Sequence, residues 1–267
     1  MEHSLDLSII IVCTNEKKFL SPNLKSLAKN LDGISHEIII VDNASTDGSR
    51  ELIKAQFPQV TLIENQKNRG AAFARNRGVE KARGDYLLFL DCDTEVLEQS
   101  ILKLLEYLQN HQQIGTLSPR LLYPDHRLQY SSRFFPNLLI FFFRLVWDGD
   151  IETLRNTSRF RRLQRYFMID WDHNDIREVD WTMSACWMLR RNVFEQLHGF
   201  DEQYFYNYED VDFAWRIKKT GLKNVYYPEA EVVHYYQRLS ANKSFFNPLK
   251  WSHLKSAIRF LIKKTLS

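Results

Sequence analysis

Cysteine, long apolar runs and a leader segment are scarce or missing in this chain. The three cysteines, Cys13, Cys92 and Cys186, are odd in number and far apart, and each lies in an apolar, strand-like segment. They are typical of small core residues in a reducing compartment. The longest apolar run, Leu138 to Phe143, is far shorter than the roughly 20 residues of a membrane-spanning helix, and the first residues carry no apolar signal region. We therefore expect a cytoplasmic protein, either soluble or peripheral to a membrane.

Excess charge and phosphate-loop motifs are also lacking. A net charge of +3 is too small to indicate nucleic acid binding, and no RNA-binding or zinc-finger signature is present. The absence of a Walker loop and of GxGxxG argues against kinase-like and nicotinamide-dependent enzymes. No repeat, low-complexity tract or Gly/Ser linker divides the 267 residues, so they predict one sizeable α/β domain.

Apolar runs alternate with helix-length segments four times in the first half. This alternation predicts βαβ units, a parallel sheet with helices on both faces, and ligands at the carboxyl ends of the strands. The expected strands are 8–13, 37–41, 60–63 and 86–90, and the helices are 17–31, 46–56, 70–83 and 96–110. The second half predicts a long strand over 179–189, a helix over 208–219, strands over 223–227 and 231–234, and an insertion over 136–178.

Two aspartates follow the fourth predicted strand, in the sequence Asp91-Cys92-Asp93. Residues spaced i, i+2 lie on the same face of a strand, and a turn at Cys92 would bring both carboxylates round one ion. Carboxylate oxygens suit Mg²⁺ or Mn²⁺, and through it a diphosphate. Capping of the following helix is the alternative role.

Polar residues at the other strand ends suggest a nucleotide. Thr14 and Asn15 follow the first strand, and Asp42 follows the second. Asp42 could accept hydrogen bonds from a ribose or base, or cap a turn. Arg75 and Asn76 lie on the third helix and could meet phosphate or base, or simply remain solvated.

Acidic residues open the helix predicted from Tyr208. Glu209, Asp210 and Asp212 lie among aromatic residues, and crowding of carboxylates in such surroundings raises the pKa of at least one, as a general base requires. Stabilisation of the helix N-terminus is the competing role. His234 follows two valines and, taken alone, is more typical of a core or surface histidine.

Seven segments together carry a family resemblance: IIIVCTN, IIIVDNASTDGS, NRGAAFARNRG, GDYLLFLDCD, VDWTMSACWMLRR, GFDEQYFYNYEDVDFAWR and YYPEAEVVHY. In order and spacing they resemble the family 2 glycosyltransferases of GT-A fold, and most of all bacterial rhamnosyltransferase-type enzymes of cell-surface polysaccharide synthesis. The resemblance extends from about Leu7 to Ser240. It implies a Rossmann-like, mostly parallel sheet flanked by helices, a small antiparallel acceptor-side portion and a C-terminal helical tail.

The resemblance also assigns roles to particular positions. It implies that an inverting reaction uses Asp210, in the Glu209-Asp210 pair, as its catalytic base. Mn²⁺ or Mg²⁺ is expected on Asp91, Asp93 and His234. The positions matching the donor site are Thr14, Asn15, Asp42, Arg75, Asn76 and Asp91, and Trp181 falls in the segment that lines the sugar and acceptor pocket.

Two positions depart from the family pattern. Cys92 stands where the family commonly has proline, and Ser184 where it commonly has glycine. The first change should alter loop stiffness more than metal binding. The second could reshape the pocket, so the identity of the sugar does not transfer with the family.

The expected domain plan is a single catalytic unit over 1–240 and a basic amphipathic tail over 241–267. Residues 1–110 would bind the nucleotide sugar and 111–240 the acceptor. The best match is transfer of L-rhamnose from dTDP-rhamnose to a glycan or lipid-diphosphate-linked acceptor. A UDP-sugar hexosyl or N-acetylhexosaminyl transferase and a non-catalytic carbohydrate-binding homologue remain alternatives, whereas a pyrophosphorylase would need a Gly-rich, basic loop after the first strand.

Basic residues gather in two places that could contact a membrane. Six Lys or Arg and no acidic residue lie between Lys243 and Ser267. The second cluster comprises Arg155, Arg159, Arg161, Arg162 and Arg165, and the tail has apolar residues at helical spacing, namely Trp251, Leu254, Ile258, Leu261 and Ile262. With the run Leu138 to Val146, these segments suit the inner face of an anionic membrane, or packing on the domain or a second subunit as a homodimer.

Overall fold

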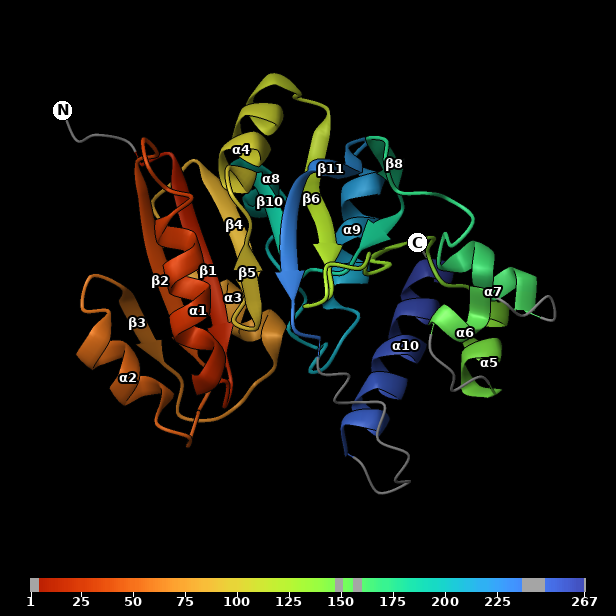
Figure 1. Cartoon of the computed structure of the whole chain (residues 1–267). Helices are drawn as coiled ribbons and strands as arrows, with labels where there is room; N and C mark the ends of the chain where they lie inside the picture. Colours follow the sequence, from red (N-terminus) through yellow and green to blue (C-terminus); the bar gives the residue numbers. More distant parts are fainter. Residues whose placement is uncertain (1–4, 147–150, 156–159, 237–247, 267) are drawn as a thin grey trace.

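The computed structural model describes residues 5–146, 151–155, 160–236 and 248–266, which form an α/β fold around a central sheet (Figure 1). In these residues the sheet has nine strands in the order β3-β2-β1-β4-β10-β6-β11-β5, with β8 also paired to β11. The strands are β1 (Leu7–Cys13), β2 (His36–Asp42), β3 (Thr61–Glu64), β4 (Tyr86–Asp91), β5 (Thr94–Val96), β6 (Ile114–Leu122), β8 (Arg177–Val179), β10 (Cys186–Arg190) and β11 (Lys223–His234). A separate antiparallel pair joins β7 (Ser132–Arg133) to β9 (Trp181–Thr182).

The predicted alternation in the first half is confirmed. Strands β1 to β4 are parallel, and the intervening helices are α1 (Lys17–Ala28), α2 (Ser49–Gln56) and α3 (Ala71–Val79), followed by α4 (Ser100–Asn110). The helix predicted from Val96 in fact begins at Ser100, because residues 94–96 form β5 and pair with the end of β11.

The second half differs more from expectation. The single strand predicted over 179–189 is wrong, since turns divide this segment into β8, β9 and β10. Conversely, the two strands predicted over 223–234 are one strand, β11, with a register shift between Tyr227 and Glu231. Pro228 lies at that shift, where it has no backbone N–H to donate to a ladder.

Apolar side chains cover both faces of the sheet. Along β1, Ile9 and Ile11 join one core cluster while Ile10 joins the other, as the alternation of side chains along a strand requires. All three cysteines are buried and free. The described part of the chain therefore uses them as the small core residues that the sequence predicts.

The remaining helices are α5 (Leu138–Val146), α6 (Ile151–Arg155), α7 (Arg161–Tyr166), α8 (Arg191–Gln196), α9 (Glu209–Lys219) and α10 (Pro248–Leu266). Helices α5 to α7 form a group beside α10, away from β3 (Figure 1). Arg159, Lys243 and the expected boundary at 240 lie outside the described residues. Among the helices that can be described, none is both long and apolar enough to cross a bilayer.

Candidate active site

The ends of three parallel strands meet at one edge of the sheet. Cys13 at the end of β1 is in register with Asp42 of β2, and Val12 with Asp91 of β4. The carboxyl ends that the sequence predicts to converge therefore do so. This edge is where parallel sheets bind their ligands.

Asp91, Asp93 and His234 form a cluster at this edge. One ligand atom from each lies within 4.8 Å of the others. Asp91 ends β4 and Asp93 occupies the turn to β5, while His234 ends β11 opposite Thr94. The Nε2 atom of His234 is 3.5 Å from Oδ1 of Asp93. Two carboxylates and an imidazole within this distance fit the donor set of a divalent cation such as Mn²⁺.

Gln129 orients the imidazole of His234. Its Oε1 lies 2.7 Å from Nδ1 of the ring. In this orientation of the Gln129 amide the oxygen accepts, so Nδ1 carries the proton and the lone pair of Nε2 is directed to the side of Asp93. Both side chains are buried, so the ring is held in place.

The turn that carries the aspartates is fixed from α1. The side-chain amide of Asn23 donates to the carbonyls of Asp91, at 3.3 Å, and Thr94, at 2.9 Å. The Thr94 hydroxyl donates to the Asp91 carbonyl at 2.7 Å. Sequence reasoning missed Asn23 and Gln129, because no local pattern signals a contact between residues so far apart in the chain.

Arg75 connects the cluster to the acids of α9. Arg75 is 3% exposed. Its guanidinium lies 2.9 Å from Oδ1 of Asp91 through Nη2 and 3.3 Å from Oε1 of Glu209 through Nη1. Nη1 also donates to the hydroxyl of Ser184 at 2.9 Å. The serine that departs from the family pattern is thus part of the network around this arginine.

Burial raises the pKa of both acids at the start of α9. The pKa of Glu209 rises to about 7, through burial and the adjacent Asp210 charge, against the opposing effect of Arg75. The pKa of Asp210 rises to about 6, again mainly through burial, while the Val211 backbone N–H and Arg75 lower it. With a pKa of about 6, Asp210 is mostly ionised at neutral pH and still basic enough to accept a proton.

The carboxyls near the cluster share this effect. Burial, with a contribution from Asp93, raises the pKa of Asp91, and Arg75 opposes the shift. Burial and both aspartates raise the pKa of Glu16 to about 9. The edge therefore gathers carboxyl groups whose ionisation a bound cation would favour.

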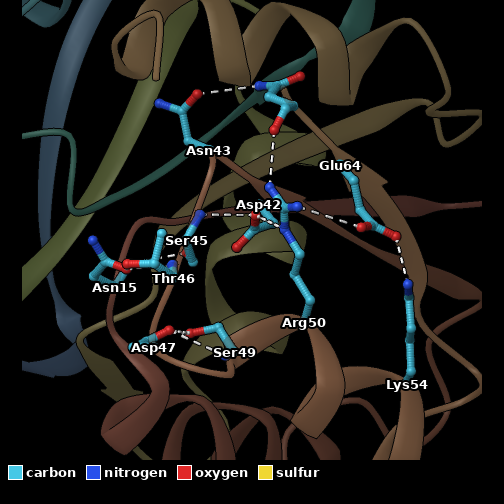
Figure 2. A network of polar contacts seen from close by, with 11 residues as sticks. Asn15, Asp42, Asn43, Ser45, Thr46, Asp47, Ser49, Arg50, Lys54 and Glu64 are labelled. Atoms are coloured by element: carbon cyan, nitrogen blue, oxygen red, sulfur yellow. Dashed lines mark hydrogen bonds and ion pairs between the residues drawn. The ribbon is translucent and has the colours of Figure 1, made fainter. Parts of the chain in front are cut away.

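Asp42 lies in a polar network at the end of β2 (Figure 2). Its Oδ1 accepts from Arg50 at 2.5 Å and from the Ser45 backbone at 3.0 Å. Its Oδ2 is buried and has no hydrogen-bond partner among the described residues. Asn15 accepts from the Thr46 backbone at 2.7 Å through Oδ1, so it ties the end of β1 to this loop, and the neighbouring Thr14 is half-buried.

Two other predicted site residues, Asn76 and Trp181, form hydrogen bonds with the protein backbone. The Asn76 amide donates to the Phe200 carbonyl at 2.9 Å and accepts from the Phe200 backbone at 3.0 Å. Trp181, in β9, donates from Nε1 to the Phe134 carbonyl at 3.0 Å and is buried. Asn76 thus fixes the segment that leads towards α9, and Trp181 the start of the 134–146 region.

The family model described as glycosyl transferase family 2 matches residues 8–197. This match covers more than half of the chain and includes Asp91, Asp93 and Arg75. The chain belongs to glycosyltransferase family 2.

Curated relatives of this family 2 chain include rhamnosyltransferases. An N-acetylglucosaminyl-diphospho-decaprenol L-rhamnosyltransferase of Mycobacterium tuberculosis is 30% identical over 213 residues, covering 74% of this chain and 66% of that protein. Rhamnosyltransferase WbbL of Escherichia coli is 24% identical over 268 aligned positions, covering 97% and 93%. The chain spans just under two thirds of the mycobacterial relative.

Solved glycosyltransferases confirm the GT-A fold. GalNAc-T7, crystallised with UDP, GalNAc and Mn²⁺, superposes with a TM-score of 0.61 at 20% identity, covering 88% of this chain and 45% of that one. The mannosyltransferase PcManGT of Pyrobaculum calidifontis, in complex with GDP-Man and Mn²⁺, gives 0.60 at 16% identity, covering 100% and 76%.

Proposed function

We propose that this glycosyltransferase moves L-rhamnose from dTDP-rhamnose to a glycan or lipid-diphosphate-linked acceptor with inversion at the anomeric carbon. One observation carries the proposal: Arg75 joins Asp91 of the carboxylate–histidine cluster to Glu209, beside Asp210. A donor diphosphate at the cluster would therefore lie close to an ionisable base. The two rhamnosyltransferase relatives support the choice of sugar.

Asp91, Asp93 and His234 would hold Mn²⁺ or Mg²⁺. When bound, the cation neutralises charge on the donor diphosphate. Two of the structural neighbours were crystallised with Mn²⁺, which supports this assignment. Gln129 keeps Nε2 of His234 available as a ligand.

Asp210 would act as general base. Its carboxylate takes the proton of the acceptor hydroxyl as that oxygen forms a bond to the anomeric carbon. The bond from this carbon to the diphosphate oxygen breaks, and its electron pair leaves with the nucleoside diphosphate. The Glu209 carboxylate, held by Arg75, maintains the charge balance beside the base.

The donor would lie along the edge formed by residues 1–110. Thr14, Asn15 and Asp42 would contact the nucleoside, with the buried Oδ2 of Asp42 still able to accept a hydrogen bond. Arg75 and Asn76 would support the base or diphosphate side. The acceptor would lie against residues 111–240, which include Trp181 and the insertion 136–178. The tail, 241–267, would contact the cytoplasmic face of the inner membrane peripherally.

The test is transfer by the purified protein with dTDP-rhamnose, UDP-glucose, UDP-N-acetylglucosamine and GDP-mannose, with and without Mn²⁺, on a synthetic lipid-diphosphate N-acetylglucosamine acceptor. The proposal expects rhamnosyl transfer from the dTDP donor, with the anomeric configuration of the product inverted by NMR. Transfer from a UDP-sugar instead would replace the donor, and retention of configuration would contradict the mechanism.

A further inference from the structure

The inner face of α10 packs on the segment that precedes the acids of α9. Ala257 and Phe260 are buried. The hydroxyl of Ser256 donates to the Tyr206 carbonyl at 3.0 Å, and the Asn207 amide lies 2.9 Å from Nδ1 of His253. This helix is therefore part of the packed structure around the candidate active site.

Charge pairs join the same two elements. Nζ of Lys263 lies 2.6 Å from Oδ1 of the fully buried Asp212 and 3.2 Å from Oδ2 of Asp201. Asp212 is two residues from Asp210 on α9. α10 therefore contacts directly the helix that carries the proposed base, and a displacement of α10 would break this ion pair.

The outer face of α10 presents an exposed apolar stripe. Its large side chains range in exposure from 42% for Trp251 to 82% for Leu266 and include Ile258 and Ile262. Their spacings of seven, four and four residues put them on one side of a helix. Lys255 is also exposed between Trp251 and Ile258.

A second exposed apolar surface lies on α5. Leu138, Leu139 and Phe142 are 42% to 60% exposed. The segment that leads into α5 touches α10, because Lys264 donates to the Pro136 carbonyl at 3.2 Å. Figure 1 shows the group of α5, α6 and α7 beside α10, on the side of the molecule remote from β3. We call the exposed apolar residues of α10, namely Trp251, Ile258, Ile262 and Leu266, the apolar face.

Basic residues outnumber acidic ones around the apolar face, although Lys263 is paired with Asp201 and Asp212 and α6 contains Glu152. Residues 248–266 contain five Lys or Arg and no acidic residue, and α7, in the group beside α10, contains Arg161, Arg162 and Arg165. An apolar stripe with tryptophan, flanked by basic residues, is typical of helices that lie in the interface of an anionic bilayer. A self-association surface would instead have to bring these like charges together.

We propose that the apolar face docks on the surface of an anionic lipid bilayer and thereby holds α9, with Asp210, next to the membrane. The benefit to catalysis rests on the proposed function, since a lipid-linked acceptor would present its sugar at that surface. The docking itself needs no catalysis. Binding would be reversible, with α10 lying in the interface and its inner face still packed on the protein.

The test compares full-length protein with Ile258→Asp/Ile262→Asp in flotation with vesicles of phosphatidylglycerol and phosphatidylcholine, and with vesicles of phosphatidylcholine alone. Leu102→Asp, an exposed leucine of α4 (39%), is the matched control. We expect wild type and the control to float with the anionic vesicles only, and the double variant to lose at least about tenfold in partitioning. Lys255→Glu should weaken binding through charge alone, and serves if the double variant does not fold.

Deletion of α10 is a poor test, because it would expose the side chains that pack on Phe260. Calorimetry of donor binding, measured for each variant, separates the docking proposal from the proposed function. A variant that loses flotation but binds the donor as wild type does would support docking, whatever reaction the protein catalyses. Equal flotation of wild type and both stripe variants would overturn the proposal. The proposal would also be overturned if wild type did not bind vesicles and formed a dimer in light scattering that Ile258→Asp/Ile262→Asp dissociates. The apolar face would then be a subunit interface.

Discussion

The guanidinium of Arg75 and the carboxylate of Asp91 lie 2.9 Å apart, although one is on a helix and the other ends a central strand. The same guanidinium reaches Glu209, 134 residues further along the chain than Arg75. A single buried cation therefore connects the candidate metal cluster to the candidate base pair. Its removal would leave two carboxylates without their partner.

Arg75→Met should destabilise the fold by about 3 kcal/mol, because breaking a buried ion pair leaves an uncompensated charge. Arg77→Met on the same helix is the control, since its pair with Glu80 is exposed on both sides and should contribute less than about 1 kcal/mol. Chemical denaturation measures both. Equal losses for the two variants would mean that the Arg75 network contributes no special stability.

Gln129→Met should weaken Mn²⁺ binding by about 10–100-fold, because the imidazole of His234 loses the acceptor that sets its tautomer. Gln129→Glu keeps an acceptor oxygen and should bind the ion at least as well as wild type. Isothermal titration with Mn²⁺ in the absence of donor gives the affinities. If both variants bind like wild type, Gln129 does not orient a metal ligand.

Gly70→Ala should disturb the segment before α9. Gly70 has φ +88, and a Cβ there would lie 2.3 Å from the Phe205 carbonyl oxygen. Gly221 has a similar φ of +86 but nothing within 4 Å, so Gly221→Ala isolates the conformational cost of about 1 kcal/mol. We expect Gly70→Ala to lower the free energy of unfolding by at least about 2 kcal/mol and to lower kcat. If denaturation gave the same loss for Gly70→Ala and Gly221→Ala, the segment around Phe205 would accommodate the added Cβ without strain.

The rate should fall as pH drops through about 6, the pKa to which burial raises Asp210. Only the ionised carboxylate can take the acceptor proton, so kcat/KM should be level above this pH and decrease about tenfold per unit below it. An aspartate at its ordinary value of 3.8 would keep the rate level to about pH 5. Mn²⁺ affinity measured over the same range controls for titration of the metal ligands.

Local pattern accounts for the parts that were predicted correctly. The apolar run 86–90 was predicted as a strand from local pattern alone, and the polar residues that follow it lie at the edge of the sheet. Asp91 and Asp93 could be found in this way. The division of 179–189 into three strands depends instead on pairing with β7, β4 and β11, which no local pattern encodes.

Long-range contacts explain the rest. Local pattern offered only a solvated Arg75, which it favoured, or a phosphate contact, because its carboxylate partners come from other elements. Gln129 and Asn23 carry no motif, yet they hold His234 and the turn at Asp91. The basic residues of α10 and the helical spacing of its apolar residues were visible in the sequence. The ion pair between Lys263 and Asp212 was not.

Asp210→Asn tests the central claim most directly. The amide has nearly the shape of the carboxylate but cannot accept the acceptor proton, so transfer should fall by about 10²–10⁴-fold. Donor affinity, measured by calorimetry with dTDP-rhamnose and Mn²⁺, should stay within a factor of about two, because Asp210 is not among the proposed donor ligands. Transfer at the wild-type rate by Asp210→Asn would contradict the account.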